Sequence, residues 1–308
     1  MGEIGRELLE LLAKQNIEYK LDVSTKERAS FKIGGRVALA IYPSTAEQVA
    51  IALSALNGAG IKHEIIGNAS NLLFAFDYYN GAFVFTDRLD RCDLYEEYIA
   101  CWAGVSLTHL ANLAAKNSLS GLEFAYGIPG FLGGAVYMNA GAYGGQMSDV
   151  VIHTVALNRK NGQISRLDEC EFGYRQSIYM RDRDLVCLGA TLKLARGKES
   201  EIRAKMAENM RQRKEKQPLE LGSAGSYFKR PEGHFAGKLI EDCGLKGFSL
   251  GGAQVSEKHA GFIVNRGDAN WREVLELERI VKEKVALAFG ITLEREVRVI
   301  TDQDVVLD

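Results

Sequence analysis

Two stretches of the chain carry glycines and amide side chains at a spacing that could bind a large planar ligand or a pyrophosphate. Eight of the 25 residues from Gly121 to Gly145, GLEFAYGIPGFLGGAVYMNAGAYGG, are glycine. Large apolar neighbours such as Phe124 and Leu132 indicate a buried segment rather than a flexible linker. Buried glycines mark tight turns or places where another surface contacts the bare backbone. A set of tight turns inside a mixed core is the alternative interpretation.

The second stretch, Gly67-Asn68-Ala69-Ser70-Asn71, directly follows an expected strand over 61–66. Ligands often bind at the carboxyl end of a strand in α/β folds, where consecutive amide N–H groups can hold phosphate oxygens. An ordinary turn stabilised by asparagine and serine is the simpler explanation. In the first stretch, Asn139 adds one side chain that can both donate and accept hydrogen bonds.

Three short motifs hold groups suited to acid, base or anion chemistry. They are Tyr174-Arg175-Gln176-Ser177, Gly225-Ser226-Tyr227-Phe228-Lys229 and Glu294-Arg295-Glu296-Val297-Arg298. A guanidinium matches a carboxylate with two parallel hydrogen bonds, and a hydroxyl can donate a proton when it is held against its acceptor. Each motif alone also fits a structural role. Arg175 could pair with Asp182 or Asp184, Ser226 could cap a turn, and Glu296 could be a solvated carboxylate.

Several other kinds of site are excluded by spacing. Gly127-x-x-Gly130-x-x-Gly133-Gly134 does not match G-x-G-x-x-G, so a Rossmann dinucleotide site is not supported. Gly233-x-x-x-Gly237-Lys238 is one residue short of a P-loop and lacks the following serine or threonine. The five histidines are scattered without H-x-H or H-x-x-x-H spacing, and we therefore predict no metal site.

Composition indicates an ordinary globular protein. The 308 residues are 46% apolar and 25% charged, enough for two or three domains, and the net charge of −2 argues against nucleic acid or an anionic membrane as the main partner. The five cysteines form no C-x-x-C pair, so we expect them to be reduced and buried. No apolar run approaches the ~18 residues of a membrane span, and we expect a cytoplasmic protein.

Periodicity and caps predict mixed helices and strands, the α+β class. Expected helices cover 3–16, about 46–57 after a Ser44–Glu47 capping box, a segment after Ser106, 199–216, and 270–289 with an Asn270-x-x-Glu273 start. Expected strands cover 37–42, 61–66, 150–157, 185–194 and 291–300. A domain boundary is expected close to Gly197, where the charged helix begins.

Taken in order, these motifs resemble the UDP-N-acetylenolpyruvoylglucosamine reductase family over about residues 26–300. The central glycine-rich segment resembles its FAD-contacting segment, and Gly233–Glu241 with Gly251–Asn265 resembles the substrate domain of short-form, second-type members. The resemblance implies a two-part FAD-binding domain of the vanillyl-alcohol-oxidase (PCMH) type plus a smaller α+β substrate domain. Residues 1–66 with 298–308 would form one FAD-binding subdomain, 67–197 the second, and 198–297 the substrate domain.

The resemblance also implies a reaction. Such an enzyme binds FAD without a covalent link and uses NADPH to reduce UDP-N-acetylglucosamine enolpyruvate to UDP-N-acetylmuramate, a precursor of bacterial peptidoglycan. It implies that Arg175 stabilises negative charge at the substrate carboxylate, that Ser226 donates the proton, and that Glu296 assists beside that carboxylate with a raised pKa. We expect a monomer. Another FAD oxidoreductase that shares the FAD domain, and a non-catalytic nucleotide-sugar binding module, are the alternatives.

The family's binding residues transfer onto matching positions of this chain. Expected FAD contacts are Gly67, Asn68, Ala69, Ser70, Asn71, Gly127, Ile128, Pro129, Gly130, Gly133, Gly134, Asn139, Ala140 and Gly141. Expected substrate contacts are Tyr143, Lys229, Arg230, Lys238, Gln254 and His259. Three features depart from the pattern. Ala69 replaces a glycine and cannot take a positive φ cheaply, Arg230 replaces a common asparagine, and 174–199 has no room for a tyrosine-bearing loop.

Overall fold

The computed structural model describes residues 5–302 and 305–306, and the chain divides into two compact units. Unit 1 comprises Met1–Leu21, Ala38–Asn68 and Gly81–Gln212. Unit 2 comprises Asp22–Val37, Ala69–Asn80 and Arg213–Asp308. Each unit is therefore assembled from three separate stretches of chain. The three-part division expected from the sequence stays a prediction.

A four-stranded sheet and two helices form the amino-terminal part. The elements are α1 (Arg6–Lys14), β1 (Glu18–Ser24), β2 (Arg36–Tyr42), α2 (Ala46–Gly58), β3 (His63–Ile66), β4 (Leu72–Ala75) and β5 (Tyr78–Phe85), and the sheet order is β1-β2-β5-β3. The expected capping box of Ser44 and Glu47 is not formed, because the N-cap is Thr45. The Thr45 side chain accepts from the N–H of Gln48, and the Gln48 side chain accepts from the N–H of Ser44.

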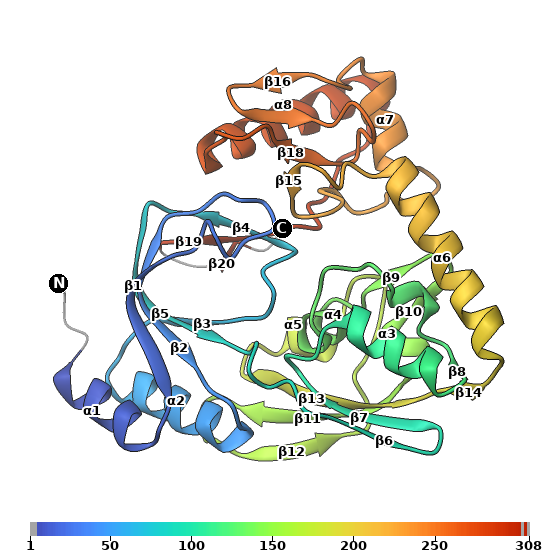
Figure 1. Ribbon diagram of the computed structural model, residues 1–308. Coiled ribbons are helices and arrows are strands. Elements are labelled where there is room, and N and C mark those ends of the chain that lie inside the picture. Colours follow the sequence, from blue (N-terminus) through green and yellow to red (C-terminus); the bar gives the residue numbers. More distant parts are fainter. Residues whose placement is uncertain (1–4, 303–304, 307–308) are drawn as a thin grey trace. The chain divides into compact units, whose positions relative to one another are not determined.

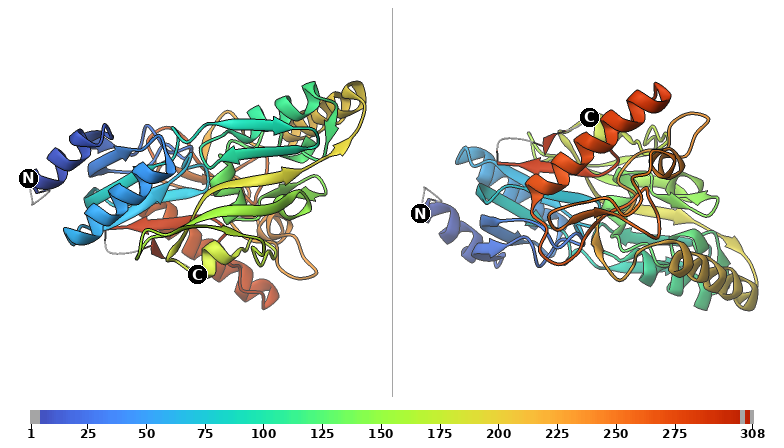
Figure 2. Two further views of the ribbon diagram at one scale, coloured as in Figure 1. Left: turned by 90° about the horizontal axis from the view of Figure 1, so that it is seen from below. Right: turned by 90° about the horizontal axis from the view of Figure 1, so that it is seen from above.

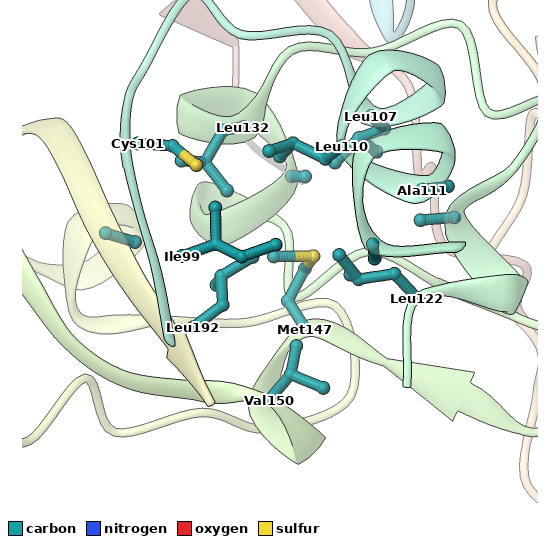
Figure 3. Packing of buried hydrophobic residues seen from close by; sticks show 14 of the residues in the cluster. Ile99, Cys101, Leu107, Leu110, Ala111, Leu122, Leu132, Met147, Val150 and Leu192 are labelled. Carbon is teal, nitrogen blue, oxygen red and sulfur yellow. The ribbon is translucent and has the colours of Figure 1, made fainter. Parts of the chain in front are cut away.

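A five-stranded antiparallel sheet carries the rest of unit 1. Its order is β12-β11-β13-β7-β6, from β6 (Cys92–Tyr95), β7 (Tyr98–Trp102), β11 (Val151–Asn158), β12 (Ile164–Leu167) and β13 (Leu185–Lys193). The helices α3 (Leu107–Lys116), α4 (Leu132–Tyr137) and α5 (Ile178–Arg181) lie on one face of this sheet (Figure 1). Ile99 and Leu192 from the sheet pack with Leu107, Leu132 and Met147 in a common core (Figure 3). Strands expected over 150–157 and 185–194 are confirmed.

Short elements complete this unit around the glycine-rich segment. They are β8 (Leu119–Ser120) paired with β14 (Ala195–Arg196), β9 (Gly141–Ala142) paired with β10 (Gly145–Gln146), and 3-10 turns at Glu123–Ala125 and Met147–Asp149. The charged helix α6 (Glu199–Lys216) has the limits expected from the sequence.

Unit 2 has two small sheets. The antiparallel one has the order β15-β18-β17-β16, from β15 (Gly222–Ser223), β16 (Ser249–Leu250), β17 (Ala253–Val255) and β18 (Ile263–Asn265). In the other, β19 (Arg298–Thr301) lies between β4, its parallel partner, and β20 (Val305–Val306). The helices are α7 (Ala236–Asp242) and α8 (Trp271–Phe289), and α8 packs on β16 and β17 (Figure 2).

The long helix α8 begins and ends where the sequence predicts. Asn270 and Glu273 form the expected capping box, and Gly290 ends the helix in the left-handed conformation at φ 67°. The expected final strand over 291–300 was wrong in its start, because β19 begins only at Arg298. Residues 291–297 alternate in polarity because Leu293 and Val297 pack into the core of unit 2, while their backbone joins no regular sheet.

Four further expectations concern cysteines, membranes, metal sites and the amino-terminal helix. The five cysteines are free thiols, but Cys92 and Cys243 are only half-buried, so the expectation that all would be buried was wrong. Within 5–302 and 305–306, no helix is long and apolar enough to cross a bilayer. In the same ranges, no three histidine, cysteine or acidic side chains converge as a metal site. Of the expected helix over 3–16, residues 3 and 4 lie outside the described residues.

Candidate active site

The glycine-rich segment lies against the chain that leads from β7 into α3. Gly133 donates its N–H to the carbonyl oxygen of Ala103, and Leu132 donates to that of Val105, each at 2.9 Å. A Cβ on Gly133 would lie 2.7 Å from the Ala103 Cβ, closer than side chains tolerate. Glycine is therefore required at position 133, since the two backbones touch there.

The segment is packed on one side and open on the other. Leu132 and Val136 are fully buried in the core, whereas Pro129 and Gly134 are exposed. No heavy atom lies within 4 Å of the position that a Cβ on Gly134 would take. The expectation of a wholly buried stretch was therefore too strong. The exposed backbone is available to a ligand, as the bare glycines suggested.

The loop from Gly67 to Asn71 leaves the end of β3 as expected. The Asn68 side chain donates to the carbonyl oxygen of Pro129 at 2.7 Å, which ties this loop to the glycine-rich segment. Ala69 is buried and takes the left-handed conformation at φ 49°, although an alanine is strained there. Position 69 thus has a backbone conformation that favours glycine.

The backbone of this loop is a suitable donor set for a pyrophosphate. In the described part of the chain, none of the five amide N–H groups from Gly67 to Asn71 donates to a protein acceptor. A Cβ on Gly67 would meet only the Thr86 hydroxyl, at 4.0 Å. Consecutive unpaired amides bind phosphate oxygens, and open glycine faces admit a flat ring. The residues present therefore fit FAD.

Asn139 is buried within the glycine-rich segment and is 2% exposed. Its Nδ2 donates to the Gly173 carbonyl oxygen and its Oδ1 accepts from the Ser148 N–H, both at 2.9 Å. The residue also has a positive φ of 42°. The side chain that we expected to face a cofactor is thus engaged inside unit 1. Whether its backbone contacts FAD stays a prediction.

Arg175 is held against the same segment. It lies in a tight turn closed by two hydrogen bonds between Gly173 and Gln176, and its own φ is 55°. Its guanidinium donates to the carbonyl oxygens of Gly141 at 3.1 Å and Asn139 at 3.5 Å. The structure therefore brings two of the predicted groups together, the arginine and the candidate cofactor segment.

Ser226 and Glu296 are neighbours across a short backbone ladder in unit 2. The carbonyl oxygen of Tyr227 accepts from the Glu296 N–H at 2.9 Å, and Lys229 donates its N–H to the Glu294 carbonyl oxygen at 2.8 Å. Ser226 is exposed, and Gly225 before it has a φ of 83°. The predicted proton donor and the predicted carboxyl group thus emerge from adjacent segments.

Asn71, at the end of the loop that begins at Gly67, contacts the Glu296 segment. Its Nδ2 donates to the Glu296 carbonyl oxygen at 3.1 Å, and its own carbonyl oxygen accepts from the Arg298 N–H at 3.0 Å. Asn71 and the segment that carries the candidate carboxyl group are therefore joined directly within unit 2.

The predicted substrate cations have diverse surroundings. Lys229 forms an ion pair with Glu294 at 3.0 Å, and Lys238, on α7, pairs with Asp242. The Arg230 guanidinium lies 3.9 Å from the centre of the Phe235 ring.

Three predicted substrate contacts are not cations. The His259 ring accepts from the Gly261 N–H at 3.1 Å, and burial lowers the pKa of this histidine. Gln254 is buried and donates to the Gly247 carbonyl oxygen, while Tyr143 has a φ of 51°. Substrate contact by all six residues stays a prediction.

One group beside these segments was missed by the sequence analysis. Glu278 of α8 is buried, and its carboxylate accepts from the Tyr227 hydroxyl and from the Arg295 guanidinium. Burial, with the Glu278 charge as a further cause, raises the pKa of Tyr227 well above its ordinary value. A signal was present, because Glu278 lies on the apolar stripe of α8 with Val274, Leu277 and Val281.

Comparisons with known proteins agree with this geometry. Residues 217–300 match the family model "UDP-N-acetylenolpyruvoylglucosamine reductase, C-terminal domain", and residues 37–168 match the model "FAD binding domain". The chain is 42% identical over 297 residues to the UDP-N-acetylenolpyruvoylglucosamine reductase of Fervidobacterium nodosum, which covers 96% of each chain. It is 43% identical over 295 residues to that of Clostridium tetani, which covers 95% of each.

A solved structure of a named reductase is also similar to this chain. The crystal structure of the reductase from Thermus caldophilus superimposes with a TM-score of 0.76 at 32% identity, and covers 92% of this chain and 98% of that one. Together with the FAD-binding match, this confirms the expected fold class, a PCMH-type FAD-binding domain combined with an α+β domain. From these near full-length matches, the chain belongs to the UDP-N-acetylenolpyruvoylglucosamine reductase family.

Proposed function

We propose that this chain catalyses the NADPH-dependent reduction of UDP-N-acetylglucosamine enolpyruvate to UDP-N-acetylmuramate, a step in the synthesis of bacterial peptidoglycan precursors. The observation that carries the proposal is the near full-length identity to named reductases, 42% over 297 residues. The FAD that this chain would hold would supply the chemistry of hydride transfer from NADPH to the enolpyruvyl group. The residues of this chain bind the reactants and control charge and protons.

The unpaired amides from Gly67 to Asn71 would hold the FAD pyrophosphate, since each N–H can donate to a phosphate oxygen. The open backbone around Gly134 would face the ring system. The remaining cofactor contacts proposed from the resemblance are Gly127, Ile128, Pro129, Gly130, Gly133, Asn139, Ala140 and Gly141.

Arg175 would stabilise the negative charge that develops on the substrate carboxylate after hydride transfer. A guanidinium suits this role because its planar donors match a carboxylate and it stays charged at every physiological pH. Among its present partners are two neutral carbonyl oxygens, those of Asn139 and Gly141. Exchanging these for a carboxylate would strengthen the interaction.

Ser226 would donate the proton to the α-carbon, and Glu296 would assist beside the carboxylate. A serine hydroxyl is a weak acid, so its position must be well defined to be effective. The ladder between the Tyr227 and Glu296 segments supports this, since it fixes both residues relative to one another. Lys229, Arg230, Lys238, His259, Gln254 and Tyr143 would contact the nucleotide sugar.

The proposal further describes a cytoplasmic monomer, because the substrate and NADPH are soluble metabolites. Light scattering of the purified protein should give a mass near 33.9 kDa. A mass of twice that value would rule out the monomer and leave the proposed reaction unaffected.

Ser226→Ala tests the assigned chemistry by separating two half-reactions. NADPH oxidation needs no proton at the α-carbon, whereas reoxidation by the enolpyruvyl substrate does. We expect reoxidation to slow by about 10²- to 10⁴-fold, with flavin reduction near wild type, in stopped-flow absorbance. Ser226→Cys should recover part of the loss. Ser249→Ala, at an exposed serine of the same unit, is the control. Unchanged reoxidation in Ser226→Ala would refute the proton-donor role.

A further inference from the structure

Glu278 is the centre of a buried charged network in unit 2. Glu278 is 3% exposed, and its carboxylate accepts three hydrogen bonds and forms one ion pair. The donors are the Tyr227 hydroxyl at 2.8 Å and Nε and Nη2 of Arg295 at 2.8 Å each, and the ion pair is with Nζ of Lys282 at 3.1 Å. The two arginine bonds form a bidentate pair, which fixes the orientation of both groups.

The network holds the residues beside the two proposed reacting groups. Tyr227 follows Ser226 in the chain, and Arg295 precedes Glu296. The two segments share backbone hydrogen bonds, including the bridge between Phe228 and Arg295. One carboxylate on α8 therefore ties both segments to the same rigid helix.

Stability alone does not explain this arrangement. Burying a carboxylate costs free energy that its partners only partly return, and apolar side chains of similar volume often stabilise a core at least as well. The other inward positions of α8, Val274, Leu277, Val281 and Val285, are all apolar and fully buried. The single charged position faces the two segments whose geometry the reaction depends on.

We propose that Glu278 is a positioning residue, which sets the location of the Ser226 hydroxyl and the Glu296 carboxyl group through Tyr227 and Arg295. This inference rests on the proposed function. Glu278 acts only through its neighbours. Its effect should therefore fall on the step that needs the proton from Ser226.

Glu278→Gln is the first variant, since it keeps the shape and removes the charge that faces Arg295. Misplacement of a reacting group by about 1 Å costs up to 10²-fold. We expect reoxidation of the flavin by the enolpyruvyl substrate to slow by about 10- to 100-fold, and its reduction by NADPH to change by less than about 3-fold. Tyr227→Phe removes one of the three hydrogen bonds to Glu278 and should give a smaller loss, about 3- to 10-fold, in the same step.

Two control variants lie on the same helix. Val281→Ala leaves a cavity in the core of unit 2 without touching the network, so it reports the effect of lowered stability alone. Glu276→Gln removes an exposed carboxylate that pairs with Arg279, so it reports the loss of a surface charge. Urea unfolding and flavin content should be measured for every variant.

The outcomes separate the inference from the proposed function. A selective loss of reoxidation in Glu278→Gln and Tyr227→Phe, absent in Val281→Ala, supports the positioning role. Equal half-reaction rates in Glu278→Gln and Val281→Ala at matched stability would overturn it. If Glu278→Gln does not fold, a wild-type reoxidation rate in Tyr227→Phe would overturn it. Ser226→Ala is the reference, because unimpaired reoxidation there would contradict the proposed function itself.

Discussion

Replacing Asn139 should show how the glycine-rich segment is joined to the turn that carries Arg175. The Asn139 side chain holds the Gly173 carbonyl oxygen and the Ser148 N–H at 2.9 Å each, in the left-handed conformation. Asn139→Gly removes these two bonds and a longer one from Nδ2 to the Gln146 side-chain oxygen at 3.4 Å, but keeps the backbone free to take a positive φ. Asn139→Ala removes the same bonds and also places a Cβ in that conformation.

The two variants should therefore differ in their free energy of unfolding by the cost of placing an alanine in the left-handed conformation. Each buried group left without a partner costs about 1–2 kcal/mol, so we expect Asn139→Gly to lower the free energy of unfolding of unit 1 by about 2–4 kcal/mol. An alanine with left-handed φ costs about 1–2 kcal/mol more than glycine, of which the lower chain entropy of alanine returns part. Asn139→Ala should thus be the less stable of the two by about 1 kcal/mol.

The chain has two tryptophans, which makes the assay specific. Trp102 lies in unit 1 and Trp271 in unit 2, so urea unfolding followed by fluorescence in a Trp271→Phe background reports on unit 1. Both Asn139 variants should also loosen the turn that carries Arg175, and they should therefore slow reoxidation of the flavin by the substrate. Stabilities within about 0.5 kcal/mol of the parent would refute the stabilising role of these hydrogen bonds. An alanine variant more stable than the glycine variant would refute the left-handed backbone.

Three further predictions concern the cofactor loops and pH. Gly133→Ala should destabilise unit 1, because its Cβ would lie 2.7 Å from that of Ala103. Gly134→Ala should fold normally, since its Cβ meets no protein atom within 4 Å. The same variant should bind FAD more weakly in fluorescence titration. Equal flavin affinity in Gly134→Ala and wild type would contradict the open face. Ala69→Gly should leave stability unchanged or raise it by up to about 1 kcal/mol, because it relieves a positive φ of 49°, and a clear loss of stability would contradict that backbone assignment. Burial lowers the pKa of His259 below its ordinary 6.5, so its contribution to stability is present above pH 6.5 and is lost as the pH falls through the lower folded value. Urea unfolding of unit 2 at several pH values should show this slope, and His259→Gln should flatten it; an unchanged slope would count against the buried neutral ring.

Much of the fold could be predicted because the signals were local. The capping box at Asn270 and the left-handed Gly290 set the limits of α8, and runs rich in apolar residues located β11 and β13. The segment 291–297 was wrongly predicted as a strand, because alternate burial arises whenever an extended chain lies on a core, with or without a sheet partner. Backbone pairing with Tyr227 and Lys229 is non-local, so no pattern within the segment could have revealed it.

The residue types of the candidate site could be predicted from the sequence, but their contacts could not. Residue types and order pointed to the bare glycines, Arg175, Ser226 and Glu296, because their chemistry depends on side chains that sequence displays directly. The two shortest hydrogen bonds of Asn139 could not be predicted, since Gly173 and Ser148 contribute only backbone groups to them. Glu278 was overlooked because the partners that bury it, Tyr227 and Arg295, are far from it in the chain.

Anaerobic stopped-flow absorbance of the purified protein tests the central claim most directly. NADPH should bleach the oxidised flavin band, and subsequent UDP-N-acetylglucosamine enolpyruvate should restore it, with UDP-N-acetylmuramate formed in equal amount. A flavin that NADPH reduces but the enolpyruvyl substrate cannot reoxidise would indicate a different FAD oxidoreductase. A protein without flavin absorbance that still binds the nucleotide sugar would contradict the account altogether.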